Sequence, residues 1–543
     1  MTSSTKQYLV IAAIDFGTTY SGYAYAFLHD LRKTDQAENT YAELADDDEH
    51  QNWRFFKHIK MMLHSRNIHR TTKLQDDQGK SMVALDVFSA AIRYLKDDIM
   101  HTLKNRITNI LDNEVKWVIT VPAIWNYKAK QFMKEAAVQA GIDARLVCLA
   151  HEPEAAAIFC KHVEVCKTED SKGNFKLECF KKGSQFMILD LGGGTVDITA
   201  CEVQGDGSLK ELCPRGGGPW GGTVVDAHLY NCLENAIRKK VMDSFSKTCK
   251  WDHLKLRELI EQQKRLCMTA STTMKDPTNP RSKEVRIDLP SALFTIYEKQ
   301  QNETLAKTLG RERGKPCIKR TKICFPDESF SAAFKKPTES IIKEIRSLIS
   351  KNNLHRLNTF MMVGGFSESP IIQQAVRDAF PEKIVIIPEE TSTAVLKGAV
   401  LYGYQSSNIH SRMLPYSFGI STCEQYDAQR HRGVTMYEGN EVEDVFCPYV
   451  KKGSTVTEEG IEVLKMFGNK SSVIEIYQTP VDNLADPEYT YKEHFECIGL
   501  VKFDSSVYAK TVDVKMNFGI HGIKVSARPT GTKEWTEKSF DAL

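Results

Sequence analysis

The fold of this chain is decided by one stretch, Phe186-Met187-Ile188-Leu189-Asp190-Leu191-Gly192-Gly193-Gly194-Thr195-Val196-Asp197-Ile198-Thr199-Ala200. Its apolar start predicts a buried strand, and its last five residues predict a second strand that returns beside the first. The three glycines allow a tight turn whose backbone N–H groups can approach a ligand closely. Such a tip suits phosphate, but carboxylates beside a phosphate repel it unless a hard cation lies between them. The stretch therefore predicts a hairpin that binds phosphate together with Mg²⁺.

A second hairpin of the same design lies near the N-terminus. The apolar strand from Tyr8 to Ile14 is followed by Asp15-Phe16-Gly17-Thr18-Thr19 and by a second strand, Ser21 to Phe27. A plain turn between core strands is the ordinary alternative for either hairpin alone, but two matched copies weaken that alternative. With Asp15 and Asp190 lying 175 residues apart, the pair indicates an internal duplication. We expect two lobes that each present a phosphate-binding hairpin to a shared cleft.

The composition excludes several classes of protein. A chain of 543 residues is too long for one core, so two or more domains are expected. The net charge of +2 gives no electrostatic reason to expect nucleic acid or a membrane as a partner. The N-terminal apolar run is too short for a signal peptide, and no run approaches the length of a membrane span. The 14 cysteines form no CxxC pair, which argues against a zinc module and for a reducing compartment.

Three further segments carry candidate ligand contacts. Glu152 follows the strand from Leu146 to Ala150 and can face the cleft. The helix His253 to Met268 presents Glu261, Lys264 and Arg265 on one face, although on spacing alone a solvated helix surface is much the commoner explanation. The strand Thr359 to Val363 runs into Gly364-Gly365 and then into a helix, which is a junction that favours anions or polar ligand edges.

The sequence pattern changes near residue 414. Short strands alternate with turns from there on, and helical patterns disappear. We therefore expect an all-β sandwich domain over residues 414–543, joined by a polar linker at 406–413. Because the chain stops at Leu543, we expect this domain to have no helical lid.

Five motifs in this order resemble the heat-shock 70 kDa chaperone family, within the actin and sugar-kinase superfamily. They are Ile14-Asp15-Phe16-Gly17-Thr18-Thr19, Val121-Pro122-Ala123, Glu152-Pro153-Glu154-Ala155-Ala156-Ala157, Asp190 to Asp197, and Val363-Gly364-Gly365. Details such as Lys397-Gly398-Ala399-Val400 look most like the divergent heat-shock 70 kDa protein 12 branch. The resemblance implies an α/β actin-like (ribonuclease-H-like) ATPase domain over residues 1–405. Its lobe I spans about 1–184 plus 376–405, and its lobe II about 185–375.

The resemblance implies a nucleotide site for ATP or ADP with Mg²⁺. Asp15 and Asp190 would hold the metal through its waters, and Lys60 would orient the attacking water. Glu152 and Asp197 would complete the shell of water and metal. The β- and γ-phosphates would be bound by the residues of the two hairpin tips, namely Gly17, Thr18, Thr19, Gly192, Gly193, Gly194 and Thr195.

The same resemblance assigns the rest of the nucleotide. Glu261, Lys264 and Arg265 match a family motif that contacts adenosine, and Gly364 and Gly365 would lie against the nucleotide. The residues implied in catalysis are Lys60, Glu152, Asp190, Thr195 and Asp197. Pro122 and Lys130 resemble the proline switch of the family and its basic partner, with lysine in place of arginine.

The chain departs from the family pattern in ways that bear on activity. Lys60 lies only 45 positions after Asp15, a shorter stretch than the family has. Either strands of lobe I are missing, which would keep Lys60 from the cleft and put hydrolysis in doubt, or this loop is simply short. Phe366 and Glu368 stand where the family has a small residue and an arginine, which predicts weaker or altered contact with adenine. The segment Gln405 to Arg412 lacks the acidic-leucine run that couples nucleotide state to the β domain.

Three functions fit these features. The first is an ATP-binding, heat-shock-70-like protein with weak or conditional ATP hydrolysis and a lidless β domain that binds unfolded peptide or a specific protein partner. The second is a nucleotide-gated scaffold without significant ATPase activity, and the third is a sugar or metabolite kinase of the same superfamily. We expect a monomer in the cytoplasm, with the nucleus as a second compartment.

Overall fold

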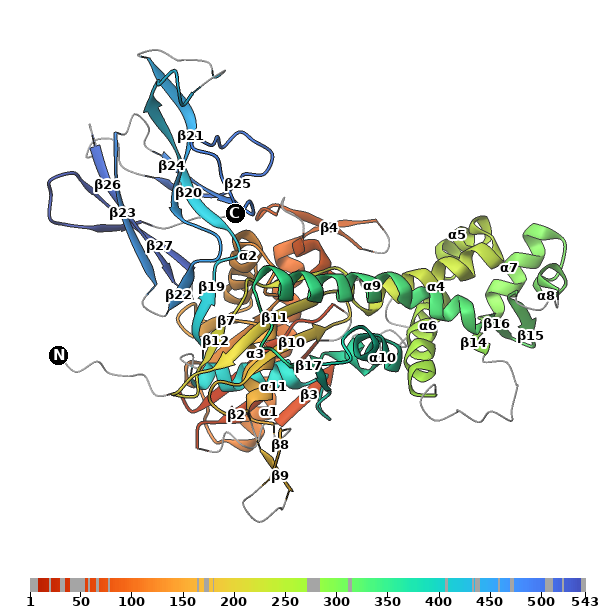
Figure 1. The fold of residues 1–543 in the computed structure, drawn as a ribbon. Helices are drawn as coiled ribbons and strands as arrows, with labels where there is room; N and C mark the ends of the chain where they lie inside the picture. The colour runs from red at the N-terminus through yellow and green to blue at the C-terminus, as the bar shows by residue number, and fades with distance from the viewer. Residues whose placement is uncertain are drawn as a thin grey trace.

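The structure is a computed structural model of the 543-residue chain. It describes residues 8–18, 21–29, 35–39, 54–56, 59–64, 68–76, 79–163, 166–169, 175–178, 180–270, 284–310, 315–405, 409–431, 434, 440–457, 460–468, 473–502, 511–519 and 522–538. Figure 1 shows the chain running from a layered α/β region to strands at its C-terminal end. Among the described residues, no helix combines the length and the apolar character needed to cross a membrane.

The first sheet has the strand order β3-β2-β1-β6-β7. Its strands are β1 (Val10–Asp15), β2 (Ser21–Phe27), β3 (Asp35–Asn39), β6 (Val115–Val121) and β7 (Val147–His151). β1 and β2 form the predicted antiparallel hairpin, and β1, β6 and β7 run parallel. Short elements connect or extend these strands, namely η3 (Ile59–His64), β4 (Lys73–Gln75), β5 (Ser81–Val83), η4 (Asp112–Glu114), β8 (Cys166–Glu169) and β9 (Phe175–Glu178).

Alternate side chains of β1 enter cores on opposite faces of this sheet, so both faces are buried. Val10, Ala12 and Ile14 enter one core with α1 (Ala84–Arg106) and α2 (Tyr127–Gln139). Ile11 and Ala13 enter another core with α3 (Glu152–Lys161) and α11 (Ala394–Tyr404). Successive side chains of a strand point to opposite faces, so a strand buried on both sides reads as a continuous apolar run.

The second sheet has the strand order β18-β17-β10-β11-β12-β19-β22, with β13 also paired to β11. Its strands are β10 (Gln185–Leu191), β11 (Val196–Val203), β12 (Leu209–Glu211), β13 (Gly216–Gly218), β17 (Thr359–Val363), β18 (Ile384–Ile386), β19 (Ile409–Met413) and β22 (Thr455–Thr457). β10 and β11 form the predicted antiparallel hairpin, and β17 runs parallel to β10 as β6 does to β1. This shared local topology agrees with the predicted duplication.

Helices and a small sheet extend the second lobe, as the green elements of Figure 1 show. The helices are α4 (Gly222–Ile237), α5 (Lys239–Thr248), α6 (Lys250–Ala270), α7 (Ser291–Gln301), α8 (Leu305–Leu309), α9 (Asp327–Lys351), η5 (Gly365–Glu368) and α10 (Pro370–Ala379). The sheet consists of β14 (Glu284–Asp288), β15 (Cys317–Lys319) and β16 (Lys322–Pro326). One core joins these helices to the outer face of the second sheet.

The two lobes share a core where they meet. Ile11 and Val118 of the first sheet lie in the same cluster as Ile188 and Met361 of the second sheet. The small residues of α3 and α11 belong to that cluster, and Gly398 of α11 lies so close to Ala155 that a Cβ there would be 1.7 Å from the Ala155 carbonyl oxygen. The tight packing of α3 against α11 fixes Glu152, the first residue of α3.

Two segments differ from the expected bounds of lobe I and of the linker. β18 pairs with β17 in the second sheet, although residues 376–405 are expected in lobe I. Residues 409–413, part of the expected linker, form β19, which pairs with β12 in parallel and with β22 in antiparallel orientation. A free edge of β12 explains the second difference, because that edge offers unpaired N–H and C=O groups to an extended segment.

Among the described residues after β19, the regular elements are all strands. One sheet has the order β21-β20-β24-β25 and the other β23-β26-β27-β28. Their strands are β20 (Ser417–Gln425), β21 (Glu441–Val450), β23 (Ile461–Gly468), β24 (Val473–Thr479), β25 (Glu496–Lys502), β26 (Thr511–Gly519), β27 (Gly522–Pro529) and β28 (Thr536–Lys538). Phe418 and Ile476 of the first sheet share a core with Met516 and Val525 of the second.

Candidate functional site

The two predicted hairpins bring their acidic residues to one place between the lobes. Asp15 ends β1, and Asp190 lies directly opposite Asp197 across the β10–β11 hairpin. The Asp15 carboxylate accepts a hydrogen bond of 2.5 Å from the hydroxyl of Thr120, its partner on β6. Adjacent parallel strands carry both residues, so the register of the sheet fixes this contact.

Lys60 reaches the same place from η3. Its Nζ lies 2.6 Å from Oε1 of Glu152, and both side chains are buried. The short stretch before Lys60 therefore does not keep it from the cleft. Burial opposes the charge on Lys60, but the carboxylates of Glu152, Asp15 and Asp197 outweigh that effect and raise its pKa. Lys60 stays protonated at neutral pH.

The carboxylates of the site repel one another, and this repulsion adds to the rise of the pKa values of Glu152 and Asp190. Burial raises the pKa of Glu152 to about 8, against the lowering effect of Lys60, and Asp15 and Asp197 add to the rise. Burial, followed by Glu152, Asp197 and Asp15, raises the pKa of Asp190 well above its usual range. A cation near these groups would relieve the repulsion and favour their ionised forms.

Asp197 of lobe II is held by lobe I. Its Oδ1 accepts hydrogen bonds from the N–H groups of Ala123 (2.9 Å) and Ile124 (3.2 Å), which follow Pro122. Burial raises the pKa of Asp197 to about 6, although these two N–H bonds oppose the rise. Its Oδ2 is buried and has no hydrogen-bond partner among the described residues.

These observations fit a hydrated Mg²⁺. An unpartnered, buried carboxylate oxygen is costly unless a cation or an ordered water satisfies it. In the part of the chain that the structure describes, no three acidic, histidine or cysteine side chains are grouped closely enough to hold a metal directly. Mg²⁺ usually keeps several of its waters and binds through one or two carboxylates, so Asp15 and Asp190 could hold it in that way.

Backbone hydrogen bonds orient the glycine tip of the second hairpin. The carbonyl groups of Gly192, Gly193 and Gly194 accept from the N–H groups of Gly222 (3.2 Å), Thr223 (2.8 Å) and Gly221 (3.2 Å). In a trans peptide the N–H points away from the preceding C=O. The N–H groups of Gly193 and Gly194 therefore point away from the start of α4. A row of N–H groups with this orientation is what the sequence predicted for binding phosphate.

The opposite tip lies against this one. Gly17 and Thr18 follow β1 and are half-buried, and Thr18 comes so close that a Cβ on Gly194 would lie 2.5 Å from its hydroxyl oxygen. Thr19 lies outside the described residues. Thr195 is buried, and its carbonyl group accepts the N–H of Gly192 at 3.0 Å.

The glycine pair after β17 has two distinct environments. Gly364 has a φ of +81°, and a Cβ there would lie 2.6 Å from the Leu191 carbonyl oxygen and 2.7 Å from Oδ1 of Asp190. Only glycine fits such a position. A Cβ on Gly365 would meet nothing within 4 Å, so this residue borders open space beside the site.

The residues expected at adenosine divide into two groups. Lys264 is buried, and its Nζ lies 2.7 Å from Oδ2 of Asp226 and 3.3 Å from the carbonyl oxygen of Gly222. Lys264 thus reaches the glycine-rich junction. Glu261 and Arg265 form a 3.1 Å ion pair with each other on the surface of α6.

The two departures after the glycine pair have structural partners of their own. Phe366 is buried in the core of lobe II and stacks on Phe334, with ring centroids 6.1 Å apart. Glu368 accepts a hydrogen bond of 2.8 Å from the hydroxyl of Thr391. Neither side chain is a cation that could stack on a base.

A buried ionic cluster, which the sequence reasoning missed, joins both lobes to β19. We name this cluster the ionic junction; it consists of Glu154, Glu211, Arg215 and Arg412, all buried or nearly so. Both arginines donate to the Glu154 carboxylate, and Arg215 Nε also donates to Glu211 at 2.8 Å. The other Glu211 oxygen accepts the backbone N–H of Met413 at 2.6 Å. Of these four residues, only Glu154 belongs to a motif identified from the sequence, the one that begins Glu152-Pro153.

Strong electrostatic effects surround the ionic junction. Burial opposes the charge on Glu154, but Arg412 and Arg215 outweigh it and hold the pKa of Glu154 well below its usual range. Burial and the same two arginines lower the pKa of Lys130 to about 7. Beside Lys130, the ring of Tyr127 packs edge-on against Phe418 of the β region, with centroids 5.7 Å apart.

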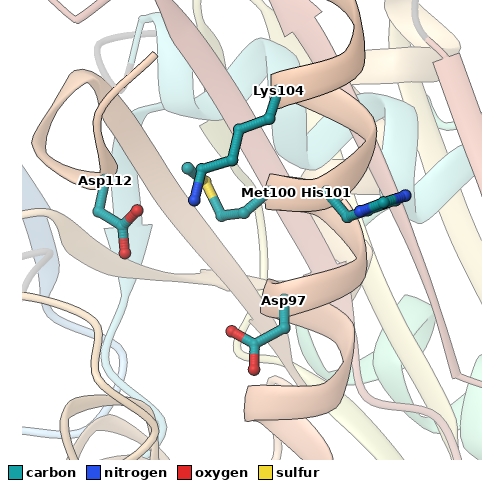
Figure 2. A pocket seen from close by; sticks show the side chains of 5 residues that line it. All are labelled: Asp97, Met100, His101, Lys104 and Asp112. Carbon is teal, nitrogen blue, oxygen red and sulfur yellow. The ribbon is translucent and has the colours of Figure 1, made fainter. Parts of the chain in front are cut away.

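A shallow pocket on α1 lies apart from this site. Figure 2 shows its lining, in which Lys104 and Met100 point from the helix toward Asp112 and His101 points away from it. None of the predicted site residues lines this pocket. This pocket is therefore separate from the candidate site.

Comparison with known proteins identifies the family. The family model described as Hsp70 protein matches residues 48–439. Heat shock 70 kDa protein 12A of Homo sapiens is 27% identical over 641 residues, covering 100% of this chain and 92% of that protein. Heat shock 70 kDa protein 12B of Homo sapiens is 27% identical over 637 residues, covering 98% and 91%. Chaperone protein dnaK of Cyanidium caldarium is 26% identical over 354 residues, covering 64% and 47%.

These matches confirm the resemblance predicted from the five motifs, including the heat-shock 70 kDa protein 12 branch. The alignment with human protein 12A is longer than this chain, so part of that relative has no counterpart here. A family model that matches most of the chain, together with a site assembled from its two hairpins, leads to one conclusion: this chain belongs to the Hsp70 protein family, which has an actin-like ATPase fold of mixed α/β content.

Proposed function

We propose that this protein binds ATP and Mg²⁺ between its two lobes and hydrolyses ATP slowly or conditionally. One observation carries the proposal: Lys60 and the carboxylates of Glu152, Asp15, Asp190 and Asp197 converge beside the glycine tip. Hsp70-family membership supports nucleotide as the ligand. The orphaned Oδ2 of Asp197 and the mutual repulsion of the carboxylates support a divalent cation.

Each residue has a chemical task in this proposal. The N–H groups of Gly193 and Gly194 bind phosphate oxygens. Asp15 and Asp190 would hold Mg²⁺ through its waters, and the ion would supply positive charge against the charge that develops during phosphoryl transfer. Lys60 and Glu152 orient a water, whose oxygen forms a bond to the γ-phosphorus as the bond to the ADP oxygen breaks. The proton of the water leaves with the inorganic phosphate. Positioning and electrostatics suffice for this step, because it needs no covalent intermediate with the protein.

Slow turnover follows from the engagement of Lys60. A 2.6 Å ion pair with Glu152 uses one of the three N–H donors of the Lys60 ammonium group, which leaves fewer donors for the water. Phe366 and Glu368 also replace the small residue and the cation expected beside adenine. The alternative that these observations favour is a nucleotide-gated scaffold that binds ATP and hardly hydrolyses it. No specific observation favours the sugar or metabolite kinase.

For the β region we propose binding of an unfolded peptide or a specific protein partner. One relative of this chain is named chaperone protein dnaK, and that name supports a chaperone role of this kind. The ionic junction supports coupling to nucleotide, because Glu154 lies two residues from Glu152 and pairs with Arg412 of β19. We further infer a cytoplasmic protein, with the nucleus as a second compartment, that acts as a monomer and binds neither nucleic acid nor membrane.

Single-turnover hydrolysis beside nucleotide-binding calorimetry tests the proposal. We expect Mg·ATP to bind and phosphate to form faster with the wild type than with Lys60→Ala. Binding without any phosphate release above the Lys60→Ala control would leave the scaffold. Absence of nucleotide binding would refute both functions.

A further inference from the structure

One apolar side chain lies between the two hairpin tips. Met61 follows Lys60 on η3 and is half-buried. Its Sδ lies 3.9 Å from the hydroxyl oxygen of Thr18 in the first tip. A Cβ added to Gly194 in the second tip would lie only 2.6 Å from the same sulfur. Met61 therefore touches both tips.

The chemistry of Met61 does not suit this place. A thioether sulfur is a weak hydrogen-bond acceptor and has no proton to donate, so it offers nothing to a phosphate oxygen. Thioethers also prefer soft metals, whereas Mg²⁺ takes oxygen ligands. Every other group that the proposed function uses here is charged or is a backbone N–H. A phosphate at this place would therefore require Met61 to move aside.

Close contact of the tips supports the same conclusion. Gly194 lacks a Cβ, and a Cβ there would lie 2.5 Å from Oγ1 and 2.8 Å from Cγ2 of Thr18. Thr18 and Met61 both lie close to Gly194, so a phosphate group placed between Thr18 and Gly194 would meet the Met61 side chain. The contact of Met61 with Thr18 and Gly194 also stabilises this arrangement, since it removes part of a flexible side chain from water.

We propose that Met61 is an affinity-determining residue that fills the phosphate position between the tips, so that a nucleoside diphosphate or triphosphate binds only after Met61 moves out. This inference rests on the proposed nucleotide function. The affinity of a protein whose competent form is a minor fraction falls by that fraction. Truncating Met61 should raise the competent fraction and tighten binding of ATP and ADP, while adenosine, which has no phosphate, should bind unchanged.

The test is a titration of the full chain with ATP, ADP and adenosine in the presence of Mg²⁺, with stopped-flow association of a fluorescent ATP analogue. Met61→Ala should bind ATP and ADP roughly five- to tenfold more tightly than the wild type, mostly through faster association. Met61→Leu, which refills the space with apolar atoms, should behave as the wild type. Met62→Ala is the matched control, because Met62 lies on the same short helix but packs against the core of lobe I.

The outcomes separate the inference from the function on which it rests. If the wild type binds ATP and Met61→Ala binds it no more tightly, the Met61 inference is wrong while the proposed function stands. An equal gain for adenosine would also overturn it, because a general loosening of the cleft would then explain the result. If neither the wild type nor Met61→Ala binds any nucleotide, the proposed function fails and the inference fails with it. A thermal melt of each variant confirms that the chain is folded.

Discussion

Glu154→Gln should weaken the attachment of β19 to both lobes. Glu154 accepts from Arg412 and Arg215, and all three side chains are buried. Removing one partner of a buried ion pair costs about 3–5 kcal/mol, because the other charge stays buried without compensation. Arg215 keeps Glu211, and glutamine keeps the shape of glutamate. We therefore expect the lower end, about 3 kcal/mol of unfolding free energy.

The assay is urea unfolding combined with limited proteolysis of residues 405–413. The first unfolding transition should shift, and cleavage near β19 should become faster. The matched control is Glu135→Gln, which breaks a bidentate pair with Arg70 (2.7 and 2.8 Å) whose two side chains are 29% and 43% exposed. Exposed pairs contribute about 0–1 kcal/mol. If Glu154→Gln costs no more than Glu135→Gln, the ionic junction does not hold β19.

The pH dependence of this effect has a definite sign. The folded-state pKa of Glu154 is depressed. Its contribution to stability is therefore present above the pKa of an unfolded glutamate, about 4.3, and is lost as the pH falls through the folded-state value. The difference between wild type and Glu154→Gln should be full at neutral pH and should shrink in strong acid. A constant difference across this range would point to lost packing rather than lost charge.

Four further substitutions probe separate parts of the structure. Lys130→Met should stabilise the protein most at and below neutral pH, because the pKa of Lys130 is lowered to about 7. The wild type should therefore gain stability as the pH rises from about 7 to the pKa of free lysine near 10.4. Thermal melts across this range should show a flatter stability profile for the variant, and parallel profiles would contradict this expectation. Gly364→Ala should lower the free energy of unfolding by at least about 2 kcal/mol in thermal melts, because a positive φ combines there with a clash against backbone. A Cβ on Gly365 meets nothing within 4 Å, so Gly365→Ala should change that free energy by no more than about 0.5 kcal/mol. Equal losses of stability would refute the different roles of the two glycines. Lys60→Ala should abolish phosphate release in single-turnover assays while Mg·ATP still binds, and unchanged release would remove Lys60 from the mechanism.

The hairpins and their carboxylates could be predicted from the sequence because their signals are local. An apolar run, an acidic residue, glycines and a returning strand lie within about 15 residues, and the register of such a hairpin places Asp190 opposite Asp197. The repeat of that pattern at Asp15 predicted the second lobe. The position of Glu152 could also be predicted from the sequence, because the end of a parallel strand and the start of the following helix border the same edge of the sheet.

The remaining features depend on residues distant in the sequence. The segment that forms β19 reads as polar, and Arg412 can be buried there only because Glu154, 258 positions away, accepts its charge. Met61 has no pattern that places it between two tips. The surface pairing of Glu261 with Arg265 shows the opposite case, in which helical spacing alone correctly indicated neighbours but could not place a ligand.

In the proposed function, carboxylates from both hairpins form a magnesium-dependent nucleotide site. Calorimetric titration of the full chain with ATP, with Mg²⁺ and then with EDTA, tests it most directly, alongside Asp190→Asn. We predict saturable binding with Mg²⁺, at least tenfold weaker binding without it, and a similar loss in Asp190→Asn, since about 1.4 kcal/mol from one metal contact suffices for that factor. Saturable binding that depends on neither Mg²⁺ nor Asp190, or no binding at all, would refute the proposed magnesium-dependent site.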